Sequence, residues 1–307
     1  MKKVAIYGYY REEKSFTYLL LLLDILLEND VKIVFQKPFY DLLLQHKKQL
    51  SPDKEEFLLD AYPTFETFTN YDDFPTDIDL LFTYGGDGTI LRAVTFIQGR
   101  RVPIFGINAG RLGFLATVQK EQLEKAVNLY LKGQYTISER NLIAIETKPE
   151  HPEVKKMNFA LNELVINRKN TTTMITVDTF LDDEYLSSYW ADGLIVATPT
   201  GSTAYSLSCN GPVITPDSMN FIINPIAPHN LTVRPLVIPN DFQIKMKVSG
   251  REDEYLISLD SRTYSLPMET EITAYTAPFT IKLIQFQSNS FIKTLQKKLL
   301  WGKDERN

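Results

Sequence analysis

A glycine-rich turn that carries one carboxylate is the first stretch of this sequence whose residue types suggest chemistry. Gly85–Gly88 follows a short apolar run and precedes residues 89–96, which have apolar side chains at helical spacing. A strand, a Gly-rich turn and a helix together build an anion site, because free N–H groups and the helix dipole favour phosphate there. Glycines also let the backbone approach the phosphate closely. The turn therefore predicts phosphate chemistry.

The carboxylate of Asp87 would by itself repel a phosphate, so its presence in this turn indicates a further role. One hypothesis is a metal ion that bridges Asp87 to the phosphate, and another is a general base that faces a hydroxyl nucleophile. A third is a tight turn with a capping aspartate, since Gly and Asp are common turn residues. The sequence contains neither a Walker A loop nor a GxGxxG fingerprint, which indicates phosphate chemistry of a different type.

A second stretch, residues 192–212, places small hydroxylated residues directly after an apolar strand at 194–197. Its short donors and backbone N–H groups leave room for a polar ligand. Tyr205 within it offers either a flat face for a purine or pyridine ring or a core side chain. Upstream, Asn162 and Glu163 interrupt a strand at 159–167, and a polar pair there must face solvent or find partners. Asn162 suits a base edge, and Glu163 suits a sugar hydroxyl or an amide.

The order of predicted strands and helices along the chain indicates two domains that position these residues. Up to about residue 133, strands alternate with helices, which predicts an α/β domain with a largely parallel sheet. Strand-like runs, turns and prolines then dominate up to residue 286, which predicts a β-rich C-terminal domain. We expect the segment 290–301, apolar on one helical side, to pack back on the first domain. The predicted domains are residues 1–140 with 288–307, and residues 141–287.

Composition excludes several classes of protein. The 307 residues have a net charge of −5, which argues against a nucleic-acid binder, and the single cysteine excludes an internal disulfide framework. The start of the chain has no secretory signal core, and the apolar run at 18–27 contains Asp24 and is too short for a membrane span. The histidines are too scattered to indicate a metal site by spacing. We therefore expect a cytoplasmic protein with neither nucleic acid nor a membrane as partner.

Taken in order, the motifs resemble those of the NAD kinase family. The resemblance extends over nearly the whole chain from Val4, with residues 37–69 the least typical part. The run Thr198-Pro199-Thr200-Gly201-Ser202-Thr203-Ala204-Tyr205 is more specific than the Gly-rich turn, which diacylglycerol kinases, sphingosine kinases and phosphofructokinases share in similar form. The stretches at 106–115 and 234–239 are also similar to that family.

The resemblance implies that the γ-phosphoryl group of ATP, bound with Mg²⁺ or another divalent metal, is transferred to the 2′-hydroxyl of the adenosine ribose of NAD. It also implies a site between the two domains and a homo-oligomer, either a homotetramer or a homodimer. Asp87 matches the proposed general base of the family. The positions that match substrate contacts are Gly85, Gly86, Asp87, Gly88, Arg92, Asn162, Glu163, Asp192, Thr203, Ala204, Tyr205, Ser206, Leu207 and Ser208. Where the family often has Asp-Gly-Gln, this chain has Asp260-Ser261-Arg262, so no contact is transferred to that loop.

Two other functions are compatible with parts of this sequence. A lipid kinase of the diacylglycerol type shares the Gly-rich turn, but the hydroxyl-rich loop at 200–208 argues against an apolar substrate. A non-catalytic sensor of NAD(H) or NADP(H) would bind dinucleotide without turnover, and the presence of Asp87 argues against it. Polyphosphate as an alternative donor and NADH as an alternative acceptor also stay open.

Overall fold

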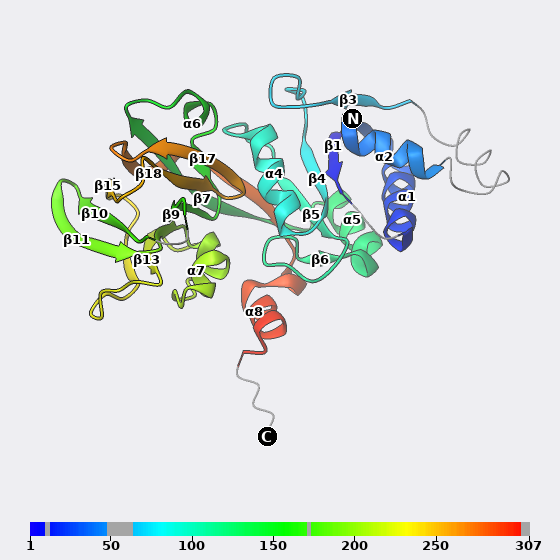
Figure 1. The fold of residues 1–307 in the computed structure, drawn as a ribbon. Coiled ribbons are helices and arrows are strands. Elements are labelled where there is room, and N and C mark those ends of the chain that lie inside the picture. The colour runs from blue at the N-terminus through cyan, green and yellow to red at the C-terminus, as the bar shows by residue number, and fades with distance from the viewer. Residues whose placement is uncertain (10–12, 48–63, 171–172, 302–307) are drawn as a thin grey trace. The chain divides into compact units, whose positions relative to one another are not determined.

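The computed structural model describes residues 1–9, 13–47, 64–170 and 173–301. The chain divides into two compact units (Figure 1). The first comprises Met1–Ser138 and Ile281–Asn307, and the second comprises Glu139–Thr280. No helix among the described residues is long and apolar enough to cross a membrane.

The first unit is built on a parallel sheet whose strands lie in the order β5-β4-β1-β2-β3. The strands are β1 (Lys3–Gly8), β2 (Lys32–Gln36), β3 (Glu66–Phe68), β4 (Leu80–Gly85) and β5 (Ile104–Asn108). The short strand β6 (Val118–Gln119) and the last residues of β18 (Glu271–Gln285) also pair with β5. The chain runs outward from β1 to β3 and then returns to add β4 and β5 on the opposite side of β1. The boundary between β1 and β4 is therefore a topological switch point, where open α/β sheets bind ligands beyond the carboxyl ends of their strands.

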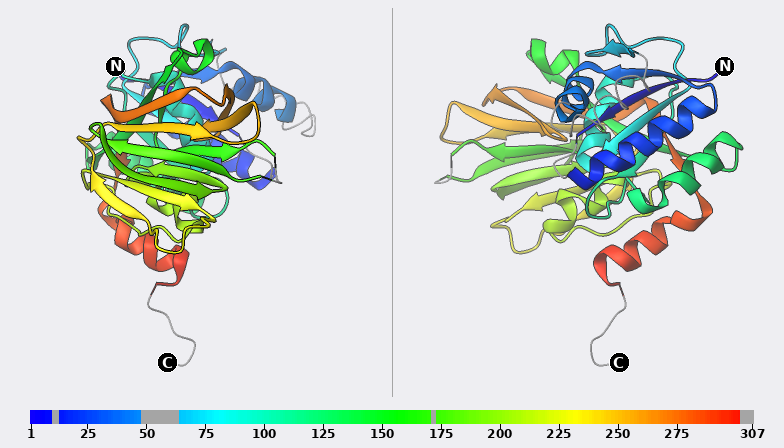
Figure 2. Two further views of the ribbon diagram at one scale, coloured as in Figure 1. Left: turned by 60° about the vertical axis from the view of Figure 1, so that its left-hand side comes forward. Right: turned by 90° about the vertical axis from the view of Figure 1, so that its right-hand side faces the viewer.

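Apolar helix faces cover this sheet. The helices are α1 (Glu13–Glu28), α2 (Lys37–Lys47), α4 (Asp87–Ile97) and α5 (Leu123–Leu131), the last preceded by the 3-10 turn Lys120–Gln122. Leu19 and Leu22 of α1 share one core with Leu123 and Val127 of α5, and Figure 2 shows the two helices side by side.

The second unit has two layers of antiparallel strands. One sheet has the order β14-β13-β12-β9-β16-β17, and the strands β11, β10, β15 and β18 follow one another in the other. The bounds are β7 (Thr136–Lys148), β8 (Phe159–Ala160), β9 (Glu163–Arg168), β10 (Ile175–Leu181), β11 (Glu184–Ala191), β12 (Gly193–Ala197), β13 (Asn220–Ile226), β14 (Leu236–Pro239), β15 (Ile244–Ser249), β16 (Glu254–Leu259) and β17 (Arg262–Pro267). Leu164, Val196, Val177 and Met246 lie in one buried core to which both sheets contribute.

Strand alternation gives the six-stranded sheet a second buried face. On β9 and β12, Val165, Ile195 and Ala197 point away from the first core and pack with Cys209, close to helix α7 (Tyr205–Ser208). Because side chains alternate along a strand, Glu163 is on the same face as Val165. The remaining short helix of this unit is α6 (Pro152–Lys156).

The C-terminal helix α8 (Phe291–Leu299) packs on the first unit, which confirms the predicted return of the chain. Ser290 caps its N-terminus by accepting a hydrogen bond from the Lys293 N–H. The Phe291 ring contacts the Phe114 ring, and the Asn289 side chain, in the 3-10 turn Gln287–Asn289, donates to the Thr117 carbonyl. Both contacts are to the loop after β5. The α/β class of the first unit and the β-rich class of the second are confirmed as well.

Candidate active site

The Gly-rich turn lies at the carboxyl end of β4, beside the end of β1. The Tyr9 N–H donates to the Tyr84 carbonyl (2.9 Å), so the two strand ends are held together. A Cβ at Gly85 would lie 2.1 Å from Oγ1 of Thr89, so packing requires glycine there. A Cβ at Gly86 or Gly88 would have no described heavy atom within 4 Å, and both residues are exposed. The space next to these two glycines is therefore open to a ligand.

Asp87 is the first residue of α4, and its carboxylate holds the loop that follows β5. The Phe114 N–H donates to Oδ2 (2.8 Å), while the Leu115 and Ala116 N–H groups donate to Oδ1 (3.0 and 2.9 Å). An ionised carboxylate offers about four lone-pair sites, so three of them hold the loop and one remains on Oδ2. A Cβ at Gly113 would lie only 1.9 Å from Oδ1 of Asp87. Glycine at 113 is therefore required for this contact.

Two residues that were not predicted as site residues complete this arrangement. The buried Asn108 side chain donates to the carbonyls of Arg111 (2.7 Å) and Ala116 (3.2 Å) and accepts from the Gly110 N–H (2.8 Å). The only sequence signal for this role was an asparagine at the end of a buried strand, before a Gly-containing loop. Lys298 of α8 places its ammonium group 3.9 Å from Oδ2 of Asp87 and 4.7 Å from the centre of the Phe114 ring.

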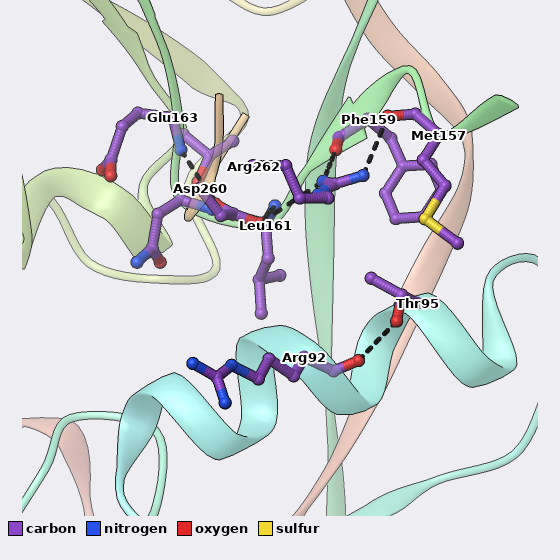
Figure 3. A network of polar contacts seen from close by, with 10 residues as sticks. Arg92, Thr95, Met157, Phe159, Leu161, Glu163, Asp260 and Arg262 are labelled. Carbon is purple, nitrogen blue, oxygen red and sulfur yellow. Dashed lines mark hydrogen bonds and ion pairs between the residues drawn. The ribbon is translucent and has the colours of Figure 1, made fainter. Parts of the chain in front are cut away.

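Arg92 lies one turn into α4 and is exposed. Its positive charge acts on the Tyr7 hydroxyl of β1. Burial raises the pKa of Tyr7, and the positive charge of Arg92 acts in the opposite direction. The Arg92 carbonyl accepts from the Thr95 hydroxyl at 2.7 Å (Figure 3). Arg92 thus lies at the same sheet edge as the Gly-rich turn.

In the second unit, Asn162 and Glu163 are buried where strand β9 begins. They are 8% and 7% exposed, yet Oδ1 of Asn162 and Oε2 of Glu163 are buried without a hydrogen-bond partner. Burial and the negative charge of Asp260 raise the pKa of Glu163 to about 8, while a hydrogen bond from the Tyr205 N–H lowers it. Buried polar atoms in native proteins nearly always have partners, so these two oxygens indicate a place where a ligand supplies hydrogen-bond partners.

The turn at Thr198–Gly201 packs directly on this pair. The Thr198 N–H donates to the Asn162 carbonyl (2.8 Å), and the Thr198 hydroxyl donates to the Leu161 carbonyl (2.6 Å). A Cβ at Gly201 would lie 2.1 Å from the Asn162 carbonyl oxygen. The hydroxyl and the glycine of this turn therefore serve close backbone packing against the Asn162–Glu163 segment.

Helix α7 follows this turn, and some of its side chains are exposed to a ligand while others are buried. Tyr205 is 40% exposed and Ser208 is exposed, whereas Ser206 is buried. The Asn224 side chain donates to the Ser206 carbonyl (3.0 Å) and hydroxyl (3.2 Å), so it clamps α7 from β13. Asn224 was not predicted, and its only signal was a polar residue inside an apolar strand. Thr203, Ala204 and Leu207 are partly exposed.

Asp192 lies at the far end of β12 from the Thr198 turn. Its carboxylate pairs with the Arg168 guanidinium at 3.0 Å. Its charge nevertheless reaches Tyr205, whose pKa is raised mainly by burial and further by Cys209 and Asp192. The second unit therefore brings Asn162, Glu163 and Tyr205 together and leaves Asp192 at the edge of the group. Across the described residues, His, Cys, Asp and Glu side chains form no group of three that can hold a metal ion.

Comparison with known proteins places this chain in a family. The model of the ATP-NAD kinase N-terminal domain matches residues 4–135, and the model of the ATP-NAD kinase C-terminal domain matches residues 161–286. The chain is 45% identical to the NAD kinase of Flavobacterium psychrophilum and 46% identical to that of Christiangramia forsetii, in each case over 99% of this chain and 100% of the relative.

Two solved structures share the fold. The yeast NADH kinase complexed with NADH has a TM-score of 0.82 and 23% identity, and the match covers 99% of this chain and 89% of that one. An NAD kinase from Archaeoglobus fulgidus in complex with ATP has a TM-score of 0.71 and 23% identity, over 97% and 98% of the two chains.

The two family models and these relatives over the whole chain show a kinase, that is, a phosphotransferase. This chain belongs to the NAD kinase family.

Proposed function

We propose that this chain transfers the γ-phosphoryl group of ATP to the 2′-hydroxyl of the adenosine ribose of NAD, which yields NADP and ADP. The observation that carries the proposal is the pair of buried side-chain oxygens, Oδ1 of Asn162 and Oε2 of Glu163, which have no partner. An adenosine supplies matching partners, because its base amino group donates and its ribose hydroxyls both donate to and accept from a carboxyl that holds its proton up to about pH 8. The exposed ring of Tyr205 beside them offers a face for stacking.

The phosphate donor belongs, in this proposal, to the Gly-rich turn. Gly86 and Gly88 face open space at the start of α4, where backbone N–H groups and the helix dipole favour phosphate. The ammonium group of Lys298 adds positive charge at the same place. ATP enters as its Mg²⁺ complex, and Mg²⁺ typically keeps phosphate oxygens and water among its ligands.

Asp87 is the proposed general base. The unused lone pair on Oδ2 accepts the proton of the ribose hydroxyl as the hydroxyl oxygen bonds to the γ-phosphorus, and the bond from that phosphorus to the bridging oxygen breaks. Phosphoryl transfer depends mainly on in-line positioning and neutralised charge. The three hydrogen bonds to the loop after β5 support this role, because they hold the carboxylate in one orientation.

A substrate panel tests the proposal. The purified chain is incubated with labelled ATP, Mg²⁺ and, separately, NAD, NADH or a diacylglycerol, and polyphosphate then replaces ATP. We expect label in NADP. Label in lipid alone would favour a diacylglycerol kinase, and NAD binding without any NADP over hours would favour a non-catalytic sensor.

The family resemblance also supports a homo-oligomer, a homotetramer or a homodimer, in the cytoplasm. Sedimentation velocity at micromolar concentration tests the first prediction, and a monomer would contradict it. Fractionation of the source cells tests the second.

A further inference from the structure

A buried carboxylate from another strand pair holds the segment that carries Asn162 and Glu163. Asp260 follows β16 and adopts a left-handed backbone (φ 52°). Its side chain is 4% exposed. It accepts from three successive N–H groups, those of Leu161 (2.9 Å), Asn162 (2.8 Å) and Glu163 (3.4 Å), as Figure 3 shows in part. In return, the Asp260 N–H donates to the Glu163 carbonyl at 3.1 Å.

This contact is needed because residues 161–162 connect β8 to β9 and lie outside both strands. Their N–H groups are buried, and a buried donor without an acceptor is costly. The Asp260 carboxylate serves as that acceptor. Fixing three consecutive backbone positions also fixes the directions in which the Asn162 and Glu163 side chains leave the chain.

Arg262, two residues further on, is the cationic partner of Asp260. Its guanidinium donates to the Met157 carbonyl (2.8 Å) and to the Phe159 carbonyl, and it lies 5.0 Å from the centre of the Phe159 ring. The distance to Oδ2 of Asp260 is 4.0 Å. Burial raises the pKa of Asp260, and the three N–H groups and Arg262 counteract that rise. Arg262 therefore ties the carboxylate to the strand that leads into the site.

We propose that Asp260 and Arg262 form a charged brace that positions Asn162 and Glu163 for the dinucleotide. The inference rests on the proposed function and adds two positioning residues to it. A buried ion pair is often no more stabilising than apolar residues of similar size, so stability alone is a poor reason for this one. Its contacts extend from the Met157 and Phe159 carbonyls to the backbone of residues 161–163, and this geometry accounts for the pair as one that sets the direction of the two side chains.

The test uses three variants and one control in the full-length protein. Arg262→Gln keeps a hydrogen-bond donor but removes the charge, and Asp260→Asn keeps an acceptor oxygen in a residue type that tolerates the left-handed backbone. The third variant combines both. Tyr255→Phe is the control, because it removes a buried hydrogen bond to the Thr270 carbonyl (2.8 Å) in the same unit. The measurements are kcat, the KM values for NAD and ATP, the NAD Kd and the thermal midpoint.

We expect Arg262→Gln to raise the NAD KM and Kd about tenfold, which corresponds to about 1.4 kcal/mol. The ATP KM should stay within about twofold of the wild-type value, because ATP is assigned to the other unit. The fold-decrease in kcat should be smaller than the fold-decrease in NAD affinity. In the double variant, the NAD Kd should rise by less than the product of the fold-increases in the two single variants. The reason is that the double variant leaves no buried charge without its partner. Tyr255→Phe should lower the thermal midpoint and leave the NAD KM unchanged.

The inference is overturned if Arg262→Gln and Asp260→Asn lower the thermal midpoint as Tyr255→Phe does but keep the NAD Kd within twofold. Strictly additive effects in the double variant would also contradict a paired brace. If Asp260→Asn does not fold, Arg262→Lys provides the same comparison, since lysine keeps the charge but loses the fork that reaches two carbonyls. Failure of the proposed function is a separate result, because wild-type protein would then form no NADP at all.

Discussion

The ammonium group of Lys298 lies 3.9 Å from Oδ2 of Asp87, so the C-terminal helix brings a positive charge to the Gly-rich turn. Both side chains are partly exposed, at 36% and 28%. Partly exposed pairs of this kind contribute about 1 kcal/mol or less to stability. The pair therefore adds little to the stability of the fold, and the positive charge of Lys298 supports the proposed phosphate site at the turn.

Lys298→Met should raise the ATP KM about five- to tenfold and change the NAD KM by less than twofold, because it removes one positive charge beside the proposed phosphate site. Steady-state kinetics with each substrate varied in turn measures this. Lys293→Met is the matched control, since it makes the same charge change on the same helix. An ATP KM that responds equally to both variants would assign the effect to general electrostatics.

Asp87→Asn should lower kcat by about 10²–10⁴-fold, the usual range for a lost general base. The NAD Kd should change much less, because an amide still hydrogen-bonds a hydroxyl. The amide nitrogen cannot accept from the loop N–H groups, so we also expect a stability loss of about 1–3 kcal/mol. The kcat is measured across a Mg²⁺ titration. Recovery at high Mg²⁺ would make Asp87 a metal ligand, and a kcat close to wild type would leave it a turn residue.

Gly88→Ala and Gly113→Ala should distinguish a glycine that leaves room for a ligand from a glycine that is required for packing. A methyl group at 88 meets no described atom within 4 Å, so stability should hold or rise by up to about 1 kcal/mol, while kcat/KM falls at least about tenfold. A methyl group at 113 would meet Asp87 at 1.9 Å, so both stability and activity should fall. Thermal melts and kinetics on both variants decide this. Full activity in Gly88→Ala would contradict a phosphate site at the turn.

The raised pKa of Glu163 predicts a pH dependence of stability. The folded group holds its proton up to a pKa of about 8, whereas the unfolded group loses it near 4.5. Between these values the unfolded state binds fewer protons, so the free energy of unfolding falls as pH rises, by at most about 1.4 kcal/mol per pH unit. Above about pH 8 this contribution is lost and the curve flattens.

Glu163→Gln removes this titration, so its stability should fall less steeply between pH 5 and 8 than that of the wild type. Thermal midpoints of both proteins at half-unit pH steps provide the comparison. Parallel curves would show that Glu163 does not titrate in this window.

Several features of this protein follow from the sequence alone because they depend on local patterns. Gly85–Gly88 between a buried strand and an amphipathic helix predicts a turn at a sheet edge, and the structure has it between β4 and α4. The acidic run Asp182-Asp183-Glu184 between two strand-like stretches predicts a hairpin loop. Asp182 and Asp183 adopt the left-handed backbone between β10 and β11, and Glu184 is already the first residue of β11. The one-sided apolar pattern of residues 290–301 likewise predicts a docked helix.

Other features were decided only by the tertiary structure. The order β5-β4-β1-β2-β3 puts the Gly-rich turn at a switch point, and strand β3 was not foreseen within residues 37–69. Asp87 holds the loop after β5, and Asp260 holds the segment at 161–163. Local patterns report which side chains are buried. The choice of neighbour for each strand, and of donors for each buried carboxylate, depends on chain segments far apart in sequence that meet only when the whole sheet has formed.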